Sequence, residues 1–358
     1  MEKLKMQNND TNTTETIDEV GSNRFKSKSA ISNFKKRIIT SVILLVFLVL
    51  YISLGVIYTL LHNLNYIEVS AYICIAITII ILIISQYEIN NATKFNKWYL
   101  QIIIIIFSIL IFLYPVNFNL YKNFSFYSFL NLGSWLSSWQ LPVIIIFFFL
   151  FVIIYTFFYD RSNLKGALIN LTTSLVITFG LKAFILISLS TIEFNGKVIG
   201  RYSFNTIVWI WLMIILSDSF AYLGGMRWGK TKLAPKISPK KTWEGAVIGF
   251  SVSFAFGLIY SLLFYFCNTD NKPLFELMTF VGNKSKALEI TLYCLFSMAF
   301  PIIGLYGDLL FSWIKRTFNI KDFSNLLPGH GGLLDRLDSI LFSLFVMFIL
   351  ILVGSNAN

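Results

Sequence analysis

Long runs of apolar residues, separated by short polar segments, make up most of the chain. Residues 38–61 and 142–158 are two examples, and neither run contains a charged residue. An apolar run of roughly 18 or more residues is long enough to cross a bilayer as a helix. By this rule we predict about nine membrane spans, at residues 37–61, 68–86, 98–116, 141–160, 165–190, 204–224, 243–266, 288–310 and 336–353. The pattern therefore predicts an all-α fold, a polytopic transmembrane helical bundle.

The polar segments between these spans alternate in charge. Lys and Arg precede the first span and follow spans two, four, six and eight, whereas the segment after span seven balances acidic against basic residues. Because Lys and Arg accumulate in cytoplasmic loops, the N-terminus is predicted to be cytoplasmic. The alternation also supports an odd number of spans, which puts the C-terminus outside.

Composition changes along the chain and predicts three regions. Residues 1–34 are rich in Asn, Thr, Ser, Lys and Glu, and we predict a disordered cytoplasmic tail there. Residues 35–200 are predicted to form N-terminal transmembrane helices, and residues 201–358 a C-terminal catalytic transmembrane region. The spans of the first half hold few polar residues, so we expect the chemistry in the second half. Lys182, inside the fifth predicted span, either breaks that span or pairs its charge internally.

Overall composition agrees with a membrane protein. Hydrophobic residues make up 56% of the chain and charged residues 13%, whereas a soluble domain carries about 25% charged residues. The net charge of +11 is explained by basic cytoplasmic loops, so no nucleic-acid partner is predicted. The three cysteines form no CxxC pair, and neither a disulfide framework nor a thiolate metal site is indicated.

Acidic residues fall at the cytoplasmic ends of four predicted spans. They are Asp218 near the end of span six, Glu244 at the start of span seven, Asp308 at the end of span eight, and Asp335 and Asp338 at the start of span nine. Charged residues within spans cost about 2.5–3.5 kcal/mol each on insertion scales and point to function. Gathered carboxylates repel one another unless cations lie among them. Oxygen ligands of this kind suit Mg²⁺, which binds one or two carboxylates together with substrate phosphates.

Basic and small residues lie beside these acids and predict phosphate binding. Before Glu244 come Ser238, Lys240, Lys241 and Thr242; between Asp308 and Asp335 come Ser312, Lys315, Arg316, Lys321, His330, Gly331 and Gly332; and Arg336 lies between the last two aspartates. Carboxylates that bind a metal, beside fixed cations, are what phosphoanhydride chemistry needs. Glycines let the backbone approach a phosphate closely, and a histidine there can hydrogen-bond a phosphate or transfer a proton.

The order and spacing of these residues resemble a known signature. The matching segments are Ser312-Trp313-Ile314-Lys315-Arg316, then Lys321-Asp322, then residues 330–338. Together they are similar to the signature of the CDP-diacylglycerol synthases, or phosphatidate cytidylyltransferases. Residues 218–222, with Gly225 and Gly229, and residues 233–245 also resemble that family. The likeness is strong over about residues 200–340. One position departs from it: the family often has Glu immediately before the serine of the signature, where this chain has Phe311.

The resemblance implies a reaction and a set of roles. Phosphatidate would attack the α-phosphate of CTP, giving CDP-diacylglycerol and pyrophosphate, at the cytoplasmic face of the cell membrane and among its lipids. The resemblance also implies that the enzyme depends on Mg²⁺ and forms a homodimer. Whether a second cation takes part is left open. Asp308 and Asp335 would be metal ligands with Asp338 beside them, and Asp218 would support the site. Lys240, Lys241, Lys315, Arg316 and Arg336 would hold phosphates.

Less specific interpretations remain for single features. Any one of the acids alone is equally consistent with a structural ion pair at a helix end, and the basic segment at 227–241 is in part explained by topology. A CTP-using enzyme that acts on another lipid is a second function. An ion-coupled transporter is a third, but its site would lie near the membrane midplane between inverted repeats, and the sequence shows neither feature.

Overall fold

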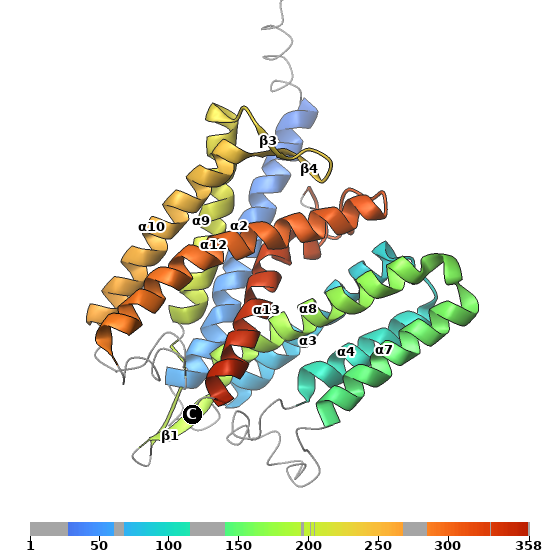
Figure 1. Cartoon of the computed structure of the whole chain (residues 1–358), viewed down its shortest axis with the longest axis horizontal. Helices are drawn as coiled ribbons and strands as arrows, with labels where there is room; N and C mark the ends of the chain where they lie inside the picture. The colour runs from blue at the N-terminus through green and yellow to red at the C-terminus, as the bar shows by residue number, and fades with distance from the viewer. Residues whose placement is uncertain are drawn as a thin grey trace, which may run out of the picture.

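The computed structural model describes residues 28–60, 68–114, 140–194, 197–200, 202–203, 205–267, 285–329 and 331–356. Figure 1 shows a bundle of long helices that cross one another at varied angles. They are α2 (Lys28–Leu60), α3 (Glu68–Ala92), α4 (Trp98–Leu113), α7 (Gln140–Tyr159), α8 (Leu164–Leu189), α9 (Asn205–Trp228), α10 (Trp243–Cys267), α12 (Lys286–Thr317) and α13 (Leu334–Asn356). A short 3₁₀ helix, η2 (Arg161–Asn163), joins α7 to α8.

Each predicted span coincides with one of these helices. Within the described ranges, seven helices qualify by length and hydropathy as membrane spans, and α4 is shorter. The prediction of a bundle of apolar, membrane-spanning helices is therefore confirmed. The predicted total of nine spans stays a prediction.

Several helices extend beyond the predicted spans. α2 begins at Lys28, so residues 28–34 of the predicted tail are helical, and residues 1–27 lie outside the described part. α3 continues to Ala92 and α12 to Thr317, each through polar residues that follow the apolar run. Hydropathy detects only the apolar length of a helix, which explains why these polar ends were not predicted.

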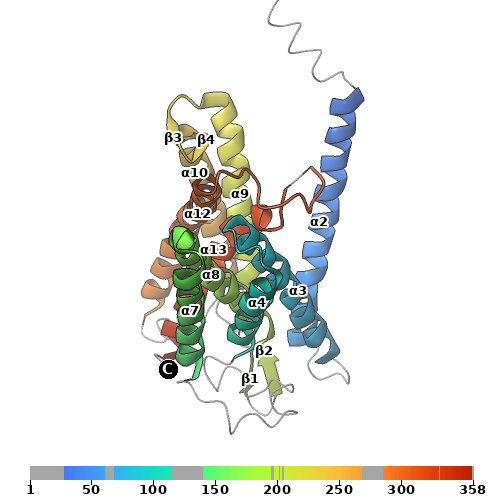
Figure 2. The same cartoon turned by 90° about the vertical axis from the view of Figure 1, so that its right-hand side faces the viewer.

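Two short antiparallel hairpins correct the all-α prediction. β1 (Thr191–Phe194) pairs with β2 (Lys197–Gly200), and β3 (Lys232–Ala234) pairs with β4 (Ser238–Thr242). Their strands have three to five residues, too few for period-2 alternation to be detected. The hairpins lie at opposite ends of the molecule, β3–β4 at the end where α2 starts and β1–β2 at the end where α13 finishes (Figures 1 and 2).

Small residues bring α9 and α10 together. The buried residues of α10 recur at every fourth position, as Gly245, Gly249, Ser253, Gly257 and Ser261. A Cβ atom on Gly249 would lie 2.3 Å from a backbone oxygen of α9, and one on Gly245 would lie 2.5 Å from another. Small residues at this spacing let membrane helices approach closely. Helix α9, which carries Asp218, is thereby held against α10.

α8 lies at the centre of the bundle. Its most apolar window is 78% buried, against 44% or less for the other six helices that qualify as spans among the described residues. Lys182 is fully buried within this unbroken helix, and its Nζ donates to the carbonyl oxygens of Ile111, at 2.8 Å, and Tyr114. These carbonyls end α4, where a cation is favoured. The expectation that Lys182 either breaks its span or pairs internally is resolved in favour of pairing.

A buried polar network in the first half was not expected. Gln86 Nε2 donates to Asn90 Oδ1, at 3.0 Å, and to Ser174 Oγ, at 2.8 Å. Asn170 Nδ2 also donates to Asn90 Oδ1, at 2.8 Å. All four side chains are essentially inaccessible. The network links α3 to α8.

Candidate active site

Three aspartates from three helices form the centre of the site. Asp218 comes from α9, Asp308 from α12 and Asp338 from α13, and the charge of each acts repulsively on the others. Asp338 is buried, with 9% exposure, whereas Asp218 is exposed. Ser339 Oγ lies between the two, 3.4 Å from both Asp218 Oδ2 and Asp338 Oδ1. We call Asp218, Asp308 and Asp338 the aspartate cluster, which is open to its surroundings on the side of Asp218.

Lys241 supplies the cation nearest to the cluster. It lies in β4, and its Nζ forms an ion pair with Asp308 Oδ2. The other oxygen of Asp308 accepts a hydrogen bond of 3.2 Å from Ser312 Oγ, one helical turn away. The charge of Lys241 also acts on Asp218. Two residues predicted from the signature, Ser312 and Lys241, therefore contact the cluster directly.

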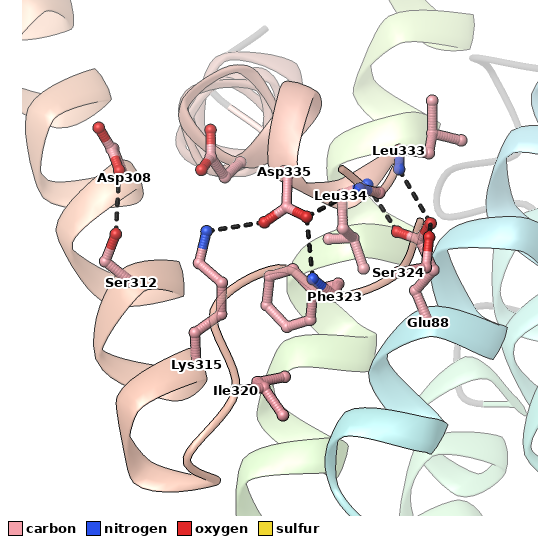
Figure 3. Close-up of polar contacts among 12 residues, drawn as sticks. Glu88, Asp308, Ser312, Lys315, Ile320, Phe323, Ser324, Leu333, Leu334 and Asp335 are labelled. Atoms are coloured by element: carbon pink, nitrogen blue, oxygen red, sulfur yellow. Dashed lines mark hydrogen bonds and ion pairs between the residues drawn. The ribbon is translucent and has the colours of Figure 1, made fainter. Parts of the chain in front are cut away.

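Asp335 has a different set of partners (Figure 3). Its Oδ1 accepts from Lys315 Nζ at 2.8 Å. Its Oδ2 accepts from the backbone N–H of Phe323 and of Gly332, both at 2.9 Å. Lys315 Nζ also lies 5.3 Å from the centre of the Phe323 ring. Asp335 therefore joins the end of α12 to the segment that precedes α13.

That segment is a tight turn whose glycines are required by the backbone. Leu327 and Gly331 exchange backbone hydrogen bonds of 2.8 and 3.2 Å. Gly329 and Gly331 have φ angles of +77° and +87°, a left-handed conformation that favours glycine. A Cβ on Gly332 would lie 2.8 Å from the Glu88 carboxylate. The predicted site residue His330 lies outside the described residues.

Glu88, at the polar end of α3, is a site residue that sequence reasoning missed. It is 2% exposed. Its carboxylate accepts hydrogen bonds from Ser324 Oγ, Leu333 N and Leu334 N, at 2.6, 2.9 and 2.8 Å. Glu88 lies two residues beyond the predicted end of span two, so it falls outside the predicted spans. The sequence signal that could have identified it is a carboxylate directly after the apolar run of span two.

Two residues predicted to bind substrate, Thr242 and Glu244, bond to the backbone at the ends of the hairpin. Thr242 Oγ1 accepts from Gly245 N at 3.2 Å and so caps the start of α10. The Glu244 carboxylate accepts from Lys230 N, at 3.1 Å, and from the N–H and hydroxyl of Thr231. These contacts fix the backbone on both sides of β3 and β4. Lys241 is therefore held beside Asp308 by a fixed hairpin.

The remaining predicted phosphate-binding residues are either exposed or bonded to the backbone. Arg316 Nε and Nη1 donate to the carbonyls of Ile237 and Ile320, at 3.2 and 3.1 Å, which ties α12 to the hairpin. Ser238 begins β4. Lys240, Lys321 and Arg336 are exposed.

Phe311, where the related signature often has Glu, is fully buried. Its ring meets that of Phe323 edge-on, with centroids 6.1 Å apart and an interplanar angle of 81°. Phe323 in turn provides one of the N–H groups that bind Asp335. This position therefore packs the segment against α12.

The carboxylate oxygens of the aspartate cluster are the kind of ligand that Mg²⁺ prefers. Within the part of the chain that the structure describes, no three His, Cys, Asp or Glu side chains are grouped as a ready metal site. Mg²⁺ needs only one or two carboxylates when substrate phosphates supply other ligands. The cluster offers carboxylate oxygens on three helices, and their repulsion is relieved by a cation.

Comparisons with known proteins agree with these features. A sequence model described as the Cytidylyltransferase family matches residues 35–353. The chain is 38% identical to the phosphatidate cytidylyltransferase of Haemophilus influenzae over 149 residues, which is 40% of this chain and 46% of that protein. It is 39% identical to that of Rickettsia typhi over 164 residues, 46% of this chain and 62% of that protein. For Brucella abortus the identity is 33% over 148 residues, 41% of this chain and 47% of that protein.

In these alignments the chain spans about half the length of the curated relatives that it matches. The family match is more extensive, because it runs from the first residues of α2 almost to the end of α13. It includes every residue of the aspartate cluster together with Lys241, Lys315 and Glu88. The chain belongs to the cytidylyltransferase family.

Proposed function

We propose that this protein is a phosphatidate cytidylyltransferase, which transfers CMP from CTP to phosphatidate and releases pyrophosphate. The observation that carries the proposal is the meeting of Asp218, Asp308 and Asp338, from three helices, beside Lys241. The names of the relatives supply the substrates. Asp338 lies close to the start of α13, where the cluster could meet a water-soluble nucleotide and a lipid headgroup at the same level.

The reaction requires that several phosphate charges be held close together. A phosphate oxygen of phosphatidate forms a bond to the α-phosphorus of CTP, and the bond between that phosphorus and the α–β bridging oxygen breaks. Lys241 is fixed beside Asp308 and faces the cluster, so it is suited to hold a phosphate oxygen. The exposed Lys240, Lys321 and Arg336 are suited to the outer phosphates, which remain in contact with solvent.

We propose that Asp308 and Asp338 hold Mg²⁺, with Asp218 beside them. Bound there, the ion would neutralise charge on the phosphate oxygens and orient the reacting groups. Ser312 and Ser339 orient the carboxylates of Asp308 and Asp338 by hydrogen bonds. Asp335, which the sequence also suggests as a ligand, has protein partners on both oxygens. Asp308 is also engaged on both oxygens, by Lys241 and Ser312. Direct coordination by Asp308 or by Asp335 would therefore require the ion pair with Lys241 or with Lys315 to open.

We also propose the membrane arrangement and the assembly that the sequence suggests. The chain would cross the cell membrane nine times, with α2 and α4 completing the set, and its N-terminus and active site would face the cytoplasm. Supporting this, the basic β3–β4 hairpin and the β1–β2 hairpin lie at opposite ends of the molecule (Figure 2). A homodimer is proposed from the resemblance alone.

An assay with defined lipids tests the reaction. The purified full-length protein in detergent is given CTP labelled at the α-phosphate, Mg²⁺ and one lipid acceptor, and the lipid product is identified by mass. Phosphatidate should give CDP-diacylglycerol, whereas a polyprenol or an ether-lipid phosphate should give little product. Asp308→Asn serves as the inactive control. Failure of the folded wild type to form CDP-diacylglycerol would refute the proposal.

A further inference from the structure

Glu88 is a buried acid from the N-terminal half of the chain that binds the start of α13. The two segments are more than 200 residues apart in sequence, and Figure 3 shows the Glu88 side chain reaching from α3 to the residues before α13. Its Oε1 accepts from Ser324 Oγ and Leu333 N, and its Oε2 accepts from Leu334 N. Both carboxylate oxygens are therefore used by one short segment.

These partners suit an ionised carboxylate. All three are donors, and an ionised carboxylate can only accept. The first N–H groups of a helix have no partner within it, and the helix dipole makes this end positive. Leu334 is the first residue of α13, so Glu88 acts as an N-terminal cap supplied by another helix. A buried acid without such donors would be strongly unfavourable.

Glu88 and Asp335 hold consecutive groups of the same backbone. Gly332 N donates to Asp335, and the next two N–H groups, of Leu333 and Leu334, donate to Glu88. Gly332 is buried between the two acids, since a Cβ there would lie 2.8 Å from the Glu88 carboxylate. Two carboxylates thus fix the direction in which α13 starts.

The direction of α13 decides where the catalytic groups lie. Asp335, Arg336 and Asp338 all follow within one turn of the residues that Glu88 binds. Asp338 must face Asp308 of α12, and Asp335 must reach Lys315 of the same helix. A rotation of the first turn of α13 would therefore separate Asp338 from Asp308.

We propose that Glu88 is a positioning residue for the reaction, which fixes the first turn of α13 so that Asp338 faces Asp308. It touches no reacting group in this arrangement and acts through the backbone of residues 333 and 334. This inference rests on the proposed function, because it assumes that Asp338 and Asp308 take part in catalysis. It also gives the N-terminal helices a part in building the site.

A matched pair of variants on α3 separates positioning from general stability. Glu88→Gln keeps the size of the side chain but directs an NH₂ group at backbone donors. Gln86→Ala, two residues away, removes an equally buried polar side chain whose recorded bonds go to Asn90, Ser174 and Ser108 instead. Glu88→Asp keeps the charge but shortens the reach. Each variant is purified full-length, and only samples with intact thermal unfolding transitions are compared.

Two readouts are measured on each variant. The first is kcat and KM for CTP and phosphatidate. We expect Glu88→Gln and Glu88→Asp to lower kcat by about 10–100-fold, the usual effect of groups that orient a site from behind, with each KM within about twofold. The second is hydrogen exchange of the amides at residues 333 and 334, which should lose protection in both variants while α9 and α10 keep theirs. Gln86→Ala should keep both kcat and this protection.

Each other outcome has a definite meaning. Wild-type kcat in Glu88→Gln, or an equal loss of kcat in Gln86→Ala at equal stability, would overturn the positioning role. Wild-type kcat in Glu88→Asp would show that a negative charge suffices without the contact to residues 333 and 334. That result would also overturn the positioning role. If the wild type makes no CDP-diacylglycerol, the proposed function fails, and the exchange at residues 333 and 334 still decides whether Glu88 holds α13.

Discussion

Two of the four aspartates at the site form an ion pair with a lysine, and the other two bond to uncharged groups. Asp308 is paired with Lys241 and Asp335 with Lys315. The recorded hydrogen-bond partners of Asp218 and Asp338 are the hydroxyl and the N–H of Ser339, which carry no charge. The cluster therefore keeps an excess of negative charge at Asp218 and Asp338. This excess is where a cation would be stabilised most, and it distinguishes Asp338 from Asp335.

The two aspartates of α13 are therefore expected to respond differently to substitution. Asp338→Asn should lower kcat by about 10²–10³-fold, as for other groups that stabilise transition-state charge, and should raise the Mg²⁺ concentration that gives half-maximal rate. Asp335→Asn should lower kcat without changing that concentration, because it breaks the ion pair with Lys315. The rate is measured against Mg²⁺ concentration at saturating CTP. If only Asp335→Asn shifts the Mg²⁺ dependence, Asp335 is the ligand and our assignment is wrong.

The sequence singled out the aspartates and lysines that the structure brings together, because charged residues in apolar helices are rare and costly. The sequence did not predict which partner each of these charged side chains binds. Lys315 was expected to bind phosphate and is paired with Asp335, and Glu244 was expected at the substrate and binds a backbone turn. Such pairings depend on helix rotation and on turn geometry. Both are set by packing between segments far apart in sequence, as the contact of Glu88 with residues 333 and 334 shows.

Among the elements, the pair of α9 and α10 is the most tightly packed part of the site. The small residues of α10, at every fourth position, face backbone atoms of α9. Asp218 lies one residue after Ser217, whose carbonyl is 2.3 Å from the position of a Gly249 Cβ. The separation of the helices at Gly249 therefore sets how far Asp218 stands from Asp308 and Asp338.

A large residue at Gly249 should push the two helices apart. Gly249→Leu is expected to destabilise the protein by about 1–3 kcal/mol or more, as overpacking usually does, and to lower kcat further as Asp218 moves. Val247→Leu on the same helix is the control, since Val247 is 58% exposed and its substitution should be neutral. Thermal unfolding in detergent and kcat are compared for both. Equal stability of the two variants would contradict the close packing of α9 on α10.

The extents of the elements could be predicted only in part. Apolar length located every helix core, because crossing a bilayer fixes a minimum length. It missed the polar turns at the end of α3 and of α12, which carry Glu88 and Lys315. It also missed the β3–β4 hairpin, whose three-residue and five-residue strands are ordered by Glu244 and Thr242 rather than by their own pattern.

At the scale of the whole molecule, α2 starts and α13 ends at opposite ends (Figures 1 and 2). This separation is what an odd number of crossings produces. α9 connects the β1–β2 hairpin to the β3–β4 hairpin and qualifies by length and hydropathy as a span. The two hairpins should therefore lie on opposite sides of the membrane.

Single cysteines on the two hairpins test this arrangement together with the orientation. The native cysteines, Cys74, Cys267 and Cys294, are first replaced by Ser. Lys236→Cys lies between β3 and β4, and Lys197→Cys begins β2. A maleimide that cannot cross the membrane should label Lys236→Cys only in inside-out vesicles and Lys197→Cys only in right-side-out vesicles. Labelling of both from one side would mean that α9 does not cross. A reversed pattern would turn the aspartate cluster away from cytosolic CTP, so the orientation and the proposed reaction would both have to be rejected.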